Sequence, residues 1–225
     1  MIQIYRNGGK RLLDLLLATM LAVLLSPLML VVFVMVRWKL GSPAIFTQPR
    51  GGLHGRHFTL FKFRSMTDAR GDDGELLPDE LRLTPTGRRI RNSSLDELPQ
   101  LWNVIRGDMS LVGPRPLYAS YIERYAGAQI RRLETRPGIT GWAQVNGRNA
   151  ISWEERFELD VWYVDHLSLG LDWKILAMTA QRVLGRRDIS AEGQATMTEF
   201  MGTPSEKQRS PTTKDADDQQ NEPPS

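Results

Sequence analysis

An uninterrupted apolar segment near the start of the chain restricts what the rest can fold into. Residues 12–36, LLDLLLATMLAVLLSPLMLVVFVMV, contain one charged side chain, Asp14. Such a run is typical of a membrane helix, because a hydrocarbon core of about 30 Å needs about 20 apolar residues. A signal peptide is a weaker interpretation, since the run exceeds a signal core and no small-residue cleavage site follows it. We therefore expect a permanent membrane anchor.

Positive charge lies on both sides of this segment. Arg6, Lys10 and Arg11 precede it, and Arg37 and Lys39 follow it. Lys and Arg next to membrane segments favour the cytoplasmic side, so both ends of the segment are expected there.

Ser26 and Pro27 interrupt the middle of the run. Proline cannot donate to the carbonyl of Val23, and the Ser26 hydroxyl can bond back toward Ala22, so we expect a kink. The stretch from Leu12 to Ser26 would rise only ~22 Å, short of a ~30 Å hydrocarbon core. A re-entrant helix-break-helix hairpin satisfies this length and the flanking charges. The alternative is an ordinary kinked helix that spans the membrane.

Beyond the anchor, the pattern predicts a small α+β domain that is mainly helical. Residues 44–47 and 58–63 read as short strands joined through glycines, which indicates a β-hairpin. Lys62 and Arg64 share one face of the second strand. They are candidates to bind phosphate, and a solvated strand face is the alternative.

Two helices are expected in the C-terminal half. Ser152 and Glu155 have the spacing of a capping box for a helix that runs to about Asp165. A second helix, over roughly residues 171–184, carries Trp173 among other apolar side chains. It would rest in the membrane interface as an amphipathic helix or pack in the core.

Composition limits the domain organisation. A chain of 225 residues can bury one good core, and the absence of cysteine excludes disulfides and thiolate metal sites. The positive net charge favours phosphate-bearing partners. We predict a membrane hairpin over residues 1–40, a cytoplasmic catalytic domain over residues 41–201 and a disordered polar tail over residues 202–225.

The main candidate for chemistry is a pair of carboxylates, Asp96 and Glu97, ahead of an amphipathic helix. Pro99 lacks an N–H, so this helix should start at or just after Asp96. The positive helix end should then keep Asp96 ionised and able to act as a nucleophile, while Glu97 could hold Mg²⁺. A capping box from Ser94 to Glu97, with no chemistry, is the alternative. The expected buried face of the helix consists of Leu95, Leu98, Leu101, Trp102 and Ile105.

Arginines flank the carboxylates in the sequence. Arg88 and Arg91 precede them, and Arg115 follows between Pro114 and Pro116. The prolines hold the Arg115 backbone nearly fixed, which preorganises its guanidinium for phosphate. A purely structural turn is the alternative.

Residues 136–149, RPGITGWAQVNGRN, are dense in glycine and hydrogen-bonding side chains. This composition is typical of a binding loop rather than of a core. We expect Gln144, Asn146 and Arg148, together with Trp142, to contact a nucleotide or a sugar.

These motifs together resemble the bacterial sugar transferases, the small monotopic polyprenyl-phosphate phosphoglycosyl transferases. The matching pieces are KR-LLD at 10–14, Ser26-Pro27, FKFRSM at 61–66, SLDELPQLWNV at 94–104, GDMSLVGPRPL at 107–117 and RPGITGWAQVNGR at 136–148.

The resemblance implies a two-step, ping-pong reaction. Asp96 would attack the β-phosphate of a UDP-sugar and release UMP, Glu97 would bind Mg²⁺, and Arg91 and Arg115 would bind phosphate. Undecaprenyl phosphate would then take the phosphosugar from the enzyme. The resemblance also implies a re-entrant hairpin broken at Ser26-Pro27 in the bacterial inner membrane, with the catalytic domain on the cytoplasmic face. Downstream glycosyltransferases are candidate partners, and nucleic acid is not expected.

The sugar is a finer question. Residues 142–160 and 197–200 most resemble enzymes that transfer N,N′-diacetylbacillosamine phosphate in bacterial protein glycosylation. Other members use UDP-GalNAc, UDP-galactose or UDP-glucose in polysaccharide biosynthesis. Two other classes stay open: an enzyme that uses Asp96 and Glu97 only as metal ligands, and a non-catalytic anchor that binds anionic lipid.

Overall fold

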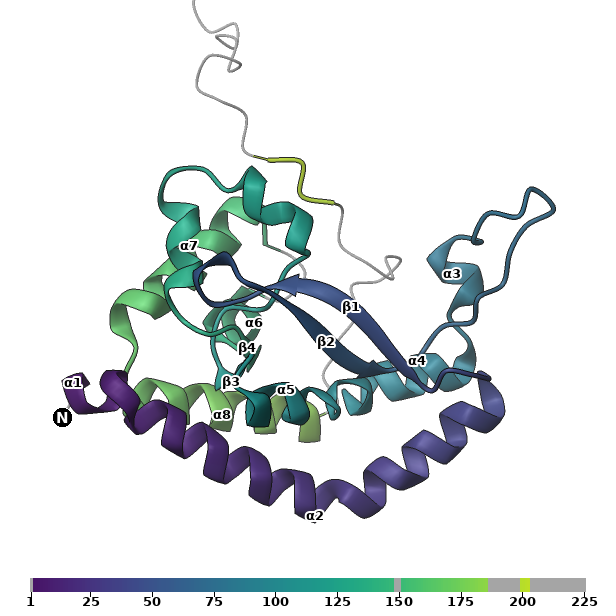
Figure 1. Cartoon of the computed structure of the whole chain (residues 1–225), viewed down its shortest axis with the longest axis horizontal. Helices are drawn as coiled ribbons and strands as arrows, with labels where there is room; N and C mark the ends of the chain where they lie inside the picture. The colour runs from purple at the N-terminus through teal and green to yellow at the C-terminus, as the bar shows by residue number, and fades with distance from the viewer. Residues whose placement is uncertain (1, 148–150, 186–198, 203–225) are drawn as a thin grey trace, which may run out of the picture.

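The computed structural model describes residues 2–147, 151–185 and 199–202 (Figure 1). The helices are α1 (Ile2–Ile4), the π-helix η1 (Tyr5–Gly9), α2 (Lys10–Lys39), α3 (Asp79–Arg82), α4 (Pro85–Asn92), α5 (Gln100–Arg106), α6 (Trp142–Gly147), α7 (Trp153–His166) and α8 (Leu169–Leu184). The strands are β1 (Ile45–Gly51), β2 (His57–Phe63), β3 (Ser110–Val112) and β4 (Gly138–Thr140). Short 3-10 turns are η2 (Leu53–Gly55), η3 (Leu95–Glu97), η4 (Ala119–Arg124) and η5 (Gly127–Glu134). The predicted class, a mainly helical α+β fold with a β-hairpin, is confirmed.

Helix α2 is a single 30-residue helix that bends near its middle, where Pro27 lies (Figure 1). Ser26 Oγ donates to the carbonyl of Val23 at 2.7 Å. Pro27 leaves that carbonyl without its usual helical donor, so the hydroxyl replaces the missing bond. The kink is confirmed, but two details differ from the prediction: the acceptor is Val23 rather than Ala22, and the helix continues through the bend without a break.

Both ends of α2 contact the domain, and the bend lies away from it (Figure 1). Asp14 and Ala18 are buried before the bend, and Val32 and Val36 are buried after it. The first pair lies near β3 and the main core, whereas the second packs against β2 and α4. The helix is therefore docked at two separate places on one side of the molecule.

The remaining surface of α2 is apolar and exposed. The stretch Tyr5–Lys39 is long and apolar enough to cross a membrane, and only 11% of its most apolar 18-residue window is buried inside the protein. A core helix of a soluble protein would be mostly buried. This helix therefore needs an apolar environment that the domain does not supply.

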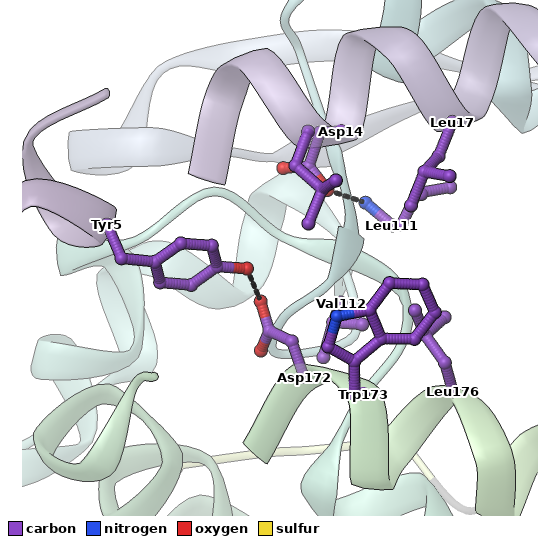
Figure 2. Close-up of a pocket in the computed structure, with 9 residues that line it drawn as sticks. Tyr5, Asp14, Leu17, Leu111, Val112, Asp172, Trp173 and Leu176 are labelled. Atoms are coloured by element: carbon purple, nitrogen blue, oxygen red, sulfur yellow. Dashed lines mark hydrogen bonds between the residues drawn. The ribbon is translucent and has the colours of Figure 1, made fainter. Parts of the chain in front are cut away.

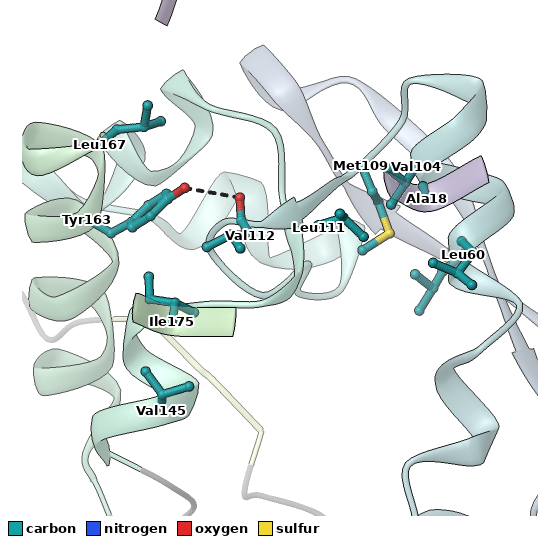
Figure 3. Packing of buried hydrophobic residues seen from close by; sticks show 11 residues of the cluster. Ala18, Leu60, Val104, Met109, Leu111, Val112, Val145, Tyr163, Leu167 and Ile175 are labelled. Carbon is teal, nitrogen blue, oxygen red and sulfur yellow. Dashed lines mark hydrogen bonds between the residues drawn. The ribbon is translucent and has the colours of Figure 1, made fainter. Parts of the chain in front are cut away.

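The main core forms where α5, α7 and α8 meet the parallel strands β3 and β4. Ser110 pairs with Gly138 and Val112 with Thr140. A Cβ at Gly138 would lie 2.1 Å from the backbone nitrogen of Gly113, so this close pairing requires glycine. Figure 3 shows Val112 between the side chains of α7 and the cluster contributed by α5 and α2.

The loop conformation expected over residues 136–149 is wrong for residues 138–147. This stretch forms β4 and α6, and Thr140, Ala143 and Val145 are buried. Its glycines permit close approach of strands rather than loop mobility. Arg148 lies outside the described residues, as does the predicted tail from residue 203 onward.

The predicted helices near the C-terminal end are confirmed. Ser152 and Glu155 form the expected reciprocal capping box at the start of α7. In α8, Ile175 is completely buried while Trp173 is half exposed. The helix therefore contributes to the core and also leaves apolar surface outside it.

A buried polar cluster joins the start of α2 to α8. Asp172 Oδ2 accepts hydrogen bonds from Lys10 Nζ at 2.5 Å and from the Tyr5 hydroxyl at 2.6 Å, and Oδ1 accepts from the Tyr163 hydroxyl at 2.7 Å. Figure 2 shows the Tyr5–Asp172 bond and, beside it, the bond that joins α2 to β3. One carboxylate thus connects four elements, η1, α2, α7 and α8.

Asp14 makes the second polar attachment of α2. Its carboxylate accepts from the Leu111 N–H at 3.1 Å, as Figure 2 shows, and also from Ser110 Oγ at 2.7 Å. The single charge in the apolar run is therefore a structural contact to β3.

Replacing Asp172 with alanine should loosen the start of α2. Lys10 is 8% exposed and would lose its closer ion-pair partner, at 2.5 Å, and keep only Asp14 at 3.9 Å. Removing one member of a buried pair costs about 3–5 kcal/mol. We expect the Tm in detergent to fall by about 10 °C. Asp165→Ala, which removes an exposed pair with Arg131, is the control and should change Tm little. Equal Tm values for the two variants would contradict this account.

Candidate active site

Asp96 and Glu97 lie in the 3-10 turn η3, between α4 and α5. Ser94 adopts a left-handed conformation, with φ of 55°, and its side chain makes no capping hydrogen bond. Helix α5 begins at Gln100, directly after Pro99. The start of the helix is thus later than predicted, and the capping-box alternative is not what positions the carboxylates.

A buried amide holds α5 against the hairpin. Asn103 is fully buried; its Oδ1 accepts from the Phe61 N–H at 3.1 Å and its Nδ2 donates to the Thr59 carbonyl at 2.7 Å. The predicted buried face of this helix is partly wrong, because Trp102 is 57% exposed while Asn103 and Val104 are inside. In the sequence, Asn103 stands out only as a polar residue among apolar ones. Its hydrogen-bond partners in β2 are known only from the fold.

Two cations share one oxygen of Glu97. Lys62 Nζ lies 2.8 Å from Glu97 Oε1, and Arg115 Nη2 lies 2.7 Å from the same atom. Lys62 Nζ also lies 3.7 Å from Asp96 Oδ2. Strand β2 and the turn after β3 therefore deliver one cation each to the carboxylate pair.

Arg91 approaches the same region from α4. Its Nε donates to Ser65 Oγ at 2.8 Å, and its charge acts on Asp96. Helix α4 can pack this closely because a Cβ at Gly87 would lie 1.7 Å from the Ser65 carbonyl oxygen. Gly87 is therefore a positioning residue that sequence reasoning missed, since nothing in the sequence shows which backbone it meets.

Two other residues that were predicted to bind phosphate, Arg64 and Arg88, have no described contact with the carboxylate pair. Arg64 pairs with Asp68 at 3.0 Å rather than with the carboxylate pair. Arg88 lines a separate surface groove of about 320 Å³ with Arg89 and Asn92. The structure does not bring either arginine to Asp96 or Glu97.

The residues of α6 that were predicted to contact a sugar donate hydrogen bonds to nearby backbone carbonyls. Gln144 Nε2 donates to the Ile139 carbonyl at 3.0 Å, and Asn146 Nδ2 donates to the Trp142 carbonyl at 2.8 Å. No described contact joins these two residues to the carboxylate pair.

The two carboxylates have opposite electrostatic environments. Burial raises the pKa of Asp96 to about 6, although the charge of Lys62 acts in the other direction. Burial alone would also raise the pKa of Glu97, but the charges of Arg115 and Lys62 lower it well below its usual range. Asp96 is thus still mostly ionised at neutral pH, but the expected stabilising helix end is absent, because α5 starts only at Gln100 and burial opposes the charge. Neighbouring acids with such divergent pKa values are typical of active sites.

The donor set fits a partly exposed Mg²⁺ site. The hydrogen bonds described for Glu97 both use Oε1, which leaves Oε2 for a metal. Mg²⁺ commonly takes one or two carboxylates and completes its shell with substrate phosphate and water. Among the described residues no group of three His, Asp or Glu side chains could hold a metal. A site here would therefore depend on substrate oxygens.

Comparison with known proteins defines the class. The family model for bacterial sugar transferases matches residues 5–186, so the chain belongs to this family. It is 57% identical over 194 residues to an uncharacterized sugar transferase, EpsL, of Bacillus subtilis, covering 86% of this chain and 96% of that protein.

Other relatives have names that state their substrates. The chain is 41% identical to the undecaprenyl-phosphate galactose phosphotransferase of Salmonella typhimurium, over 80% of this chain and 41% of the relative. It is 42% identical to the UDP-glucose:undecaprenyl-phosphate glucose-1-phosphate transferase of Xanthomonas campestris, over 80% of this chain and 39% of the relative. The chain thus spans about two fifths of these two longer proteins.

The ionisation of Asp96 should be measurable in the resting protein. With a metal chelator present, the carboxyl band lost in Asp96→Asn should titrate near pH 6 in infrared difference spectra. Lys62→Gln should move this midpoint upward, because the Lys62 charge favours the ionised form. Arg88→Gln should leave it unchanged. A midpoint near the usual value of about 4 would show that burial does not dominate.

Proposed function

We propose that this protein transfers a sugar 1-phosphate from a UDP-sugar to undecaprenyl phosphate through a covalent intermediate on Asp96. The observation that carries the proposal is the cluster at η3: a buried carboxylate, Asp96, beside an ionised one, Glu97, that two cations hold. Family membership and the names of the relatives support the substrate classes.

In the first step an oxygen of Asp96 attacks the β-phosphorus of the UDP-sugar. The bond from this phosphorus to the oxygen that bridges the two phosphates breaks, and UMP leaves with that oxygen. In the second step a phosphate oxygen of undecaprenyl phosphate attacks the same phosphorus, and the bond to Asp96 breaks. A covalent nucleophile thereby divides one difficult transfer into two easier ones.

The surrounding cations offset the charge of the transferred group. Lys62 and Arg115 are already directed at the carboxylates, and Arg91 adds a third charge nearby. Preorganised cations of this kind stabilise a phosphoryl-transfer transition state at little reorganisation cost. Mg²⁺ bound at Glu97 would draw substrate phosphate oxygens toward Asp96 and offset their charge. At neutral pH a pKa of about 6 leaves Asp96 mostly ionised, as a nucleophile requires.

We propose that α2 is a re-entrant hairpin in the bacterial inner membrane, with the domain on the cytoplasmic face. The two docking places of α2, on either side of Pro27, support this topology, because both helix ends contact the same domain. The flanking Lys and Arg residues favour the cytoplasmic side. The lipid substrate stays in the bilayer, so this topology holds the carboxylates at the headgroup level.

For the donor we propose a UDP-linked N-acetylated amino sugar such as N,N′-diacetylbacillosamine. The likeness of residues 142–160 and 197–200 to enzymes for that sugar supports it. UDP-GalNAc, UDP-galactose and UDP-glucose are the alternatives, and the relatives named for galactose and glucose support the latter two. A screen of these four nucleotides for UMP release decides among them.

The covalent intermediate can be trapped. Incubation with a labelled UDP-sugar and no lipid acceptor should leave label on Asp96, located by peptide mass spectrometry. Asp96→Asn should abolish the label and lower turnover by at least about 1,000-fold, because the nucleophile is lost. Asp68→Asn, which alters an exposed carboxylate, is the matched control.

Two outcomes would exclude the proposal in different ways. Lipid product without any adduct would indicate that Asp96 and Glu97 act only as metal ligands. Unchanged synthesis of lipid product by Asp96→Asn would exclude any role of this residue as nucleophile. A protein that binds anionic lipid but releases no UMP from any donor would be a non-catalytic anchor.

The topology can be tested with single cysteines, since the chain has none of its own. Asn7 and His57 are exposed and lie on either side of α2 in the sequence. Cysteine at each position should react with an impermeant thiol reagent in inside-out vesicles and not in intact cells. Labelling at position 7 only from outside the cell would establish a spanning helix instead.

A further inference from the structure

Arg50 of β1 is a largely buried cation that lacks a carboxylate partner among the described residues. Its Nη2 donates to the side-chain oxygen of Gln48 at 2.6 Å and its Nη1 to the carbonyl of Pro116 at 3.2 Å, both neutral acceptors. Its Nε is buried and has no hydrogen-bond partner. Burying a charge without a counter-charge is costly, so such an arrangement needs an explanation.

The position of Arg50 links it to the carboxylate site. Strand β1 contacts the segment after Pro114, because the Gly51 N–H donates to the Leu117 carbonyl at 3.1 Å. The Arg50 guanidinium lies 4.1 Å from the centre of the Tyr118 ring, which holds it in place. The segment that Arg50 contacts is the continuation of the turn that carries Arg115. Arg50 therefore lies close to Arg115, whose guanidinium bonds to Glu97.

The charges of the two arginines act on each other. Burial, together with the nearby charge of Arg115, lowers the pKa of Arg50. Lys62, Arg91 and Arg115 act on the two carboxylates, and Arg50 adds a fourth positive charge near Arg115, so the cations of this region exceed its carboxylates by two charges. A diphosphate diester such as that of a UDP-sugar carries two negative charges. Binding it would offset the excess and supply a negatively charged partner for the guanidinium of Arg50.

We propose that Arg50 forms, with Arg115, the subsite for the nucleoside-phosphate half of the donor. The inference rests on the proposed function and adds a residue to it. Arg115 bonds to Glu97 and so marks the position of the phosphate that is attacked. Arg50, on β1, contacts Pro116 and Tyr118, which follow Arg115 in the chain, and therefore takes the phosphate that leaves in UMP. Tyr118 and Gln48 act as positioning residues for its guanidinium.

Binding of UMP to the full-length protein in detergent, measured by calorimetry, tests this subsite directly. Arg50→Gln should weaken UMP binding roughly tenfold or more, the effect of losing a charge-assisted hydrogen bond. Arg56→Gln removes an exposed arginine from the same hairpin and should leave the affinity unchanged. UMP affinity for Arg50→Gln within twofold of the unmodified protein would overturn the inference.

A melting curve and a second variant show whether Arg50→Gln lowers UMP affinity only because it disturbs folding. If Arg50→Gln lowers Tm more than Arg56→Gln does, the comparison uses Arg50→Lys, which keeps the charge but loses the planar donors. A severalfold loss of UMP affinity in that variant supports the subsite, and unchanged affinity overturns it.

Failure of this inference differs from failure of the proposed function. An adduct on Asp96 in the unmodified protein, with normal UMP binding by the Arg50 variants, would leave the function intact and remove only the subsite. Absence of the adduct would remove the covalent mechanism whatever the Arg50 variants bind.

Discussion

The geometry of the site depends on one buried amide. Asn103 bonds to the backbone on both sides of Leu60, and so fixes α5 against β2 at one register. The turn η3 precedes α5, and Lys62 follows in β2, so the same contact sets the distance between Lys62 and the carboxylates. A shift of the strand by one residue would leave a buried amide unpaired, at a cost of about 1–3 kcal/mol. It would also direct Lys62 to the opposite face of the strand.

Once this register is set, two adjacent acids acquire different properties. Glu97 faces two cations and stays ionised, whereas burial makes Asp96 the harder of the two to ionise. The cations come from distant parts of the chain, β2 and the turn after β3, so the difference does not exist in the unfolded protein. A carboxylate with a raised pKa is also a more basic oxygen nucleophile once ionised. In the proposed reaction, charge compensation and nucleophilic attack are thus assigned to neighbouring residues.

The sequence was sufficient where local chemistry determines structure. The capping box at Ser152, the hairpin and the kink at Pro27 follow from spacing and residue type, whereas the contact of Lys62 with the carboxylates is known only from the fold. The sequence was insufficient where the structure depends on which segments pack against each other. Gly138 was interpreted as part of a loop because only the paired strand shows why a Cβ is excluded, and the burial that raises the Asp96 pKa comes from tertiary contacts. Arg50 was overlooked for the same reason, since its missing counter-charge is visible only when its neighbours are known.

The hydrogen bond from Ser26 to Val23 has a consequence for how the membrane segment could arise and persist. Lipid chains offer no partner for a free carbonyl, and a bent helix usually relies on neighbouring helices or water to supply one. Here Pro27 leaves the Val23 carbonyl without its helical donor, and the preceding residue, Ser26, supplies a donor in its place. The helix therefore satisfies the carbonyl at its own bend and needs no neighbouring helix or water for this purpose. Because only two adjacent residues are involved, the same bend could arise in another membrane helix by changes at two positions.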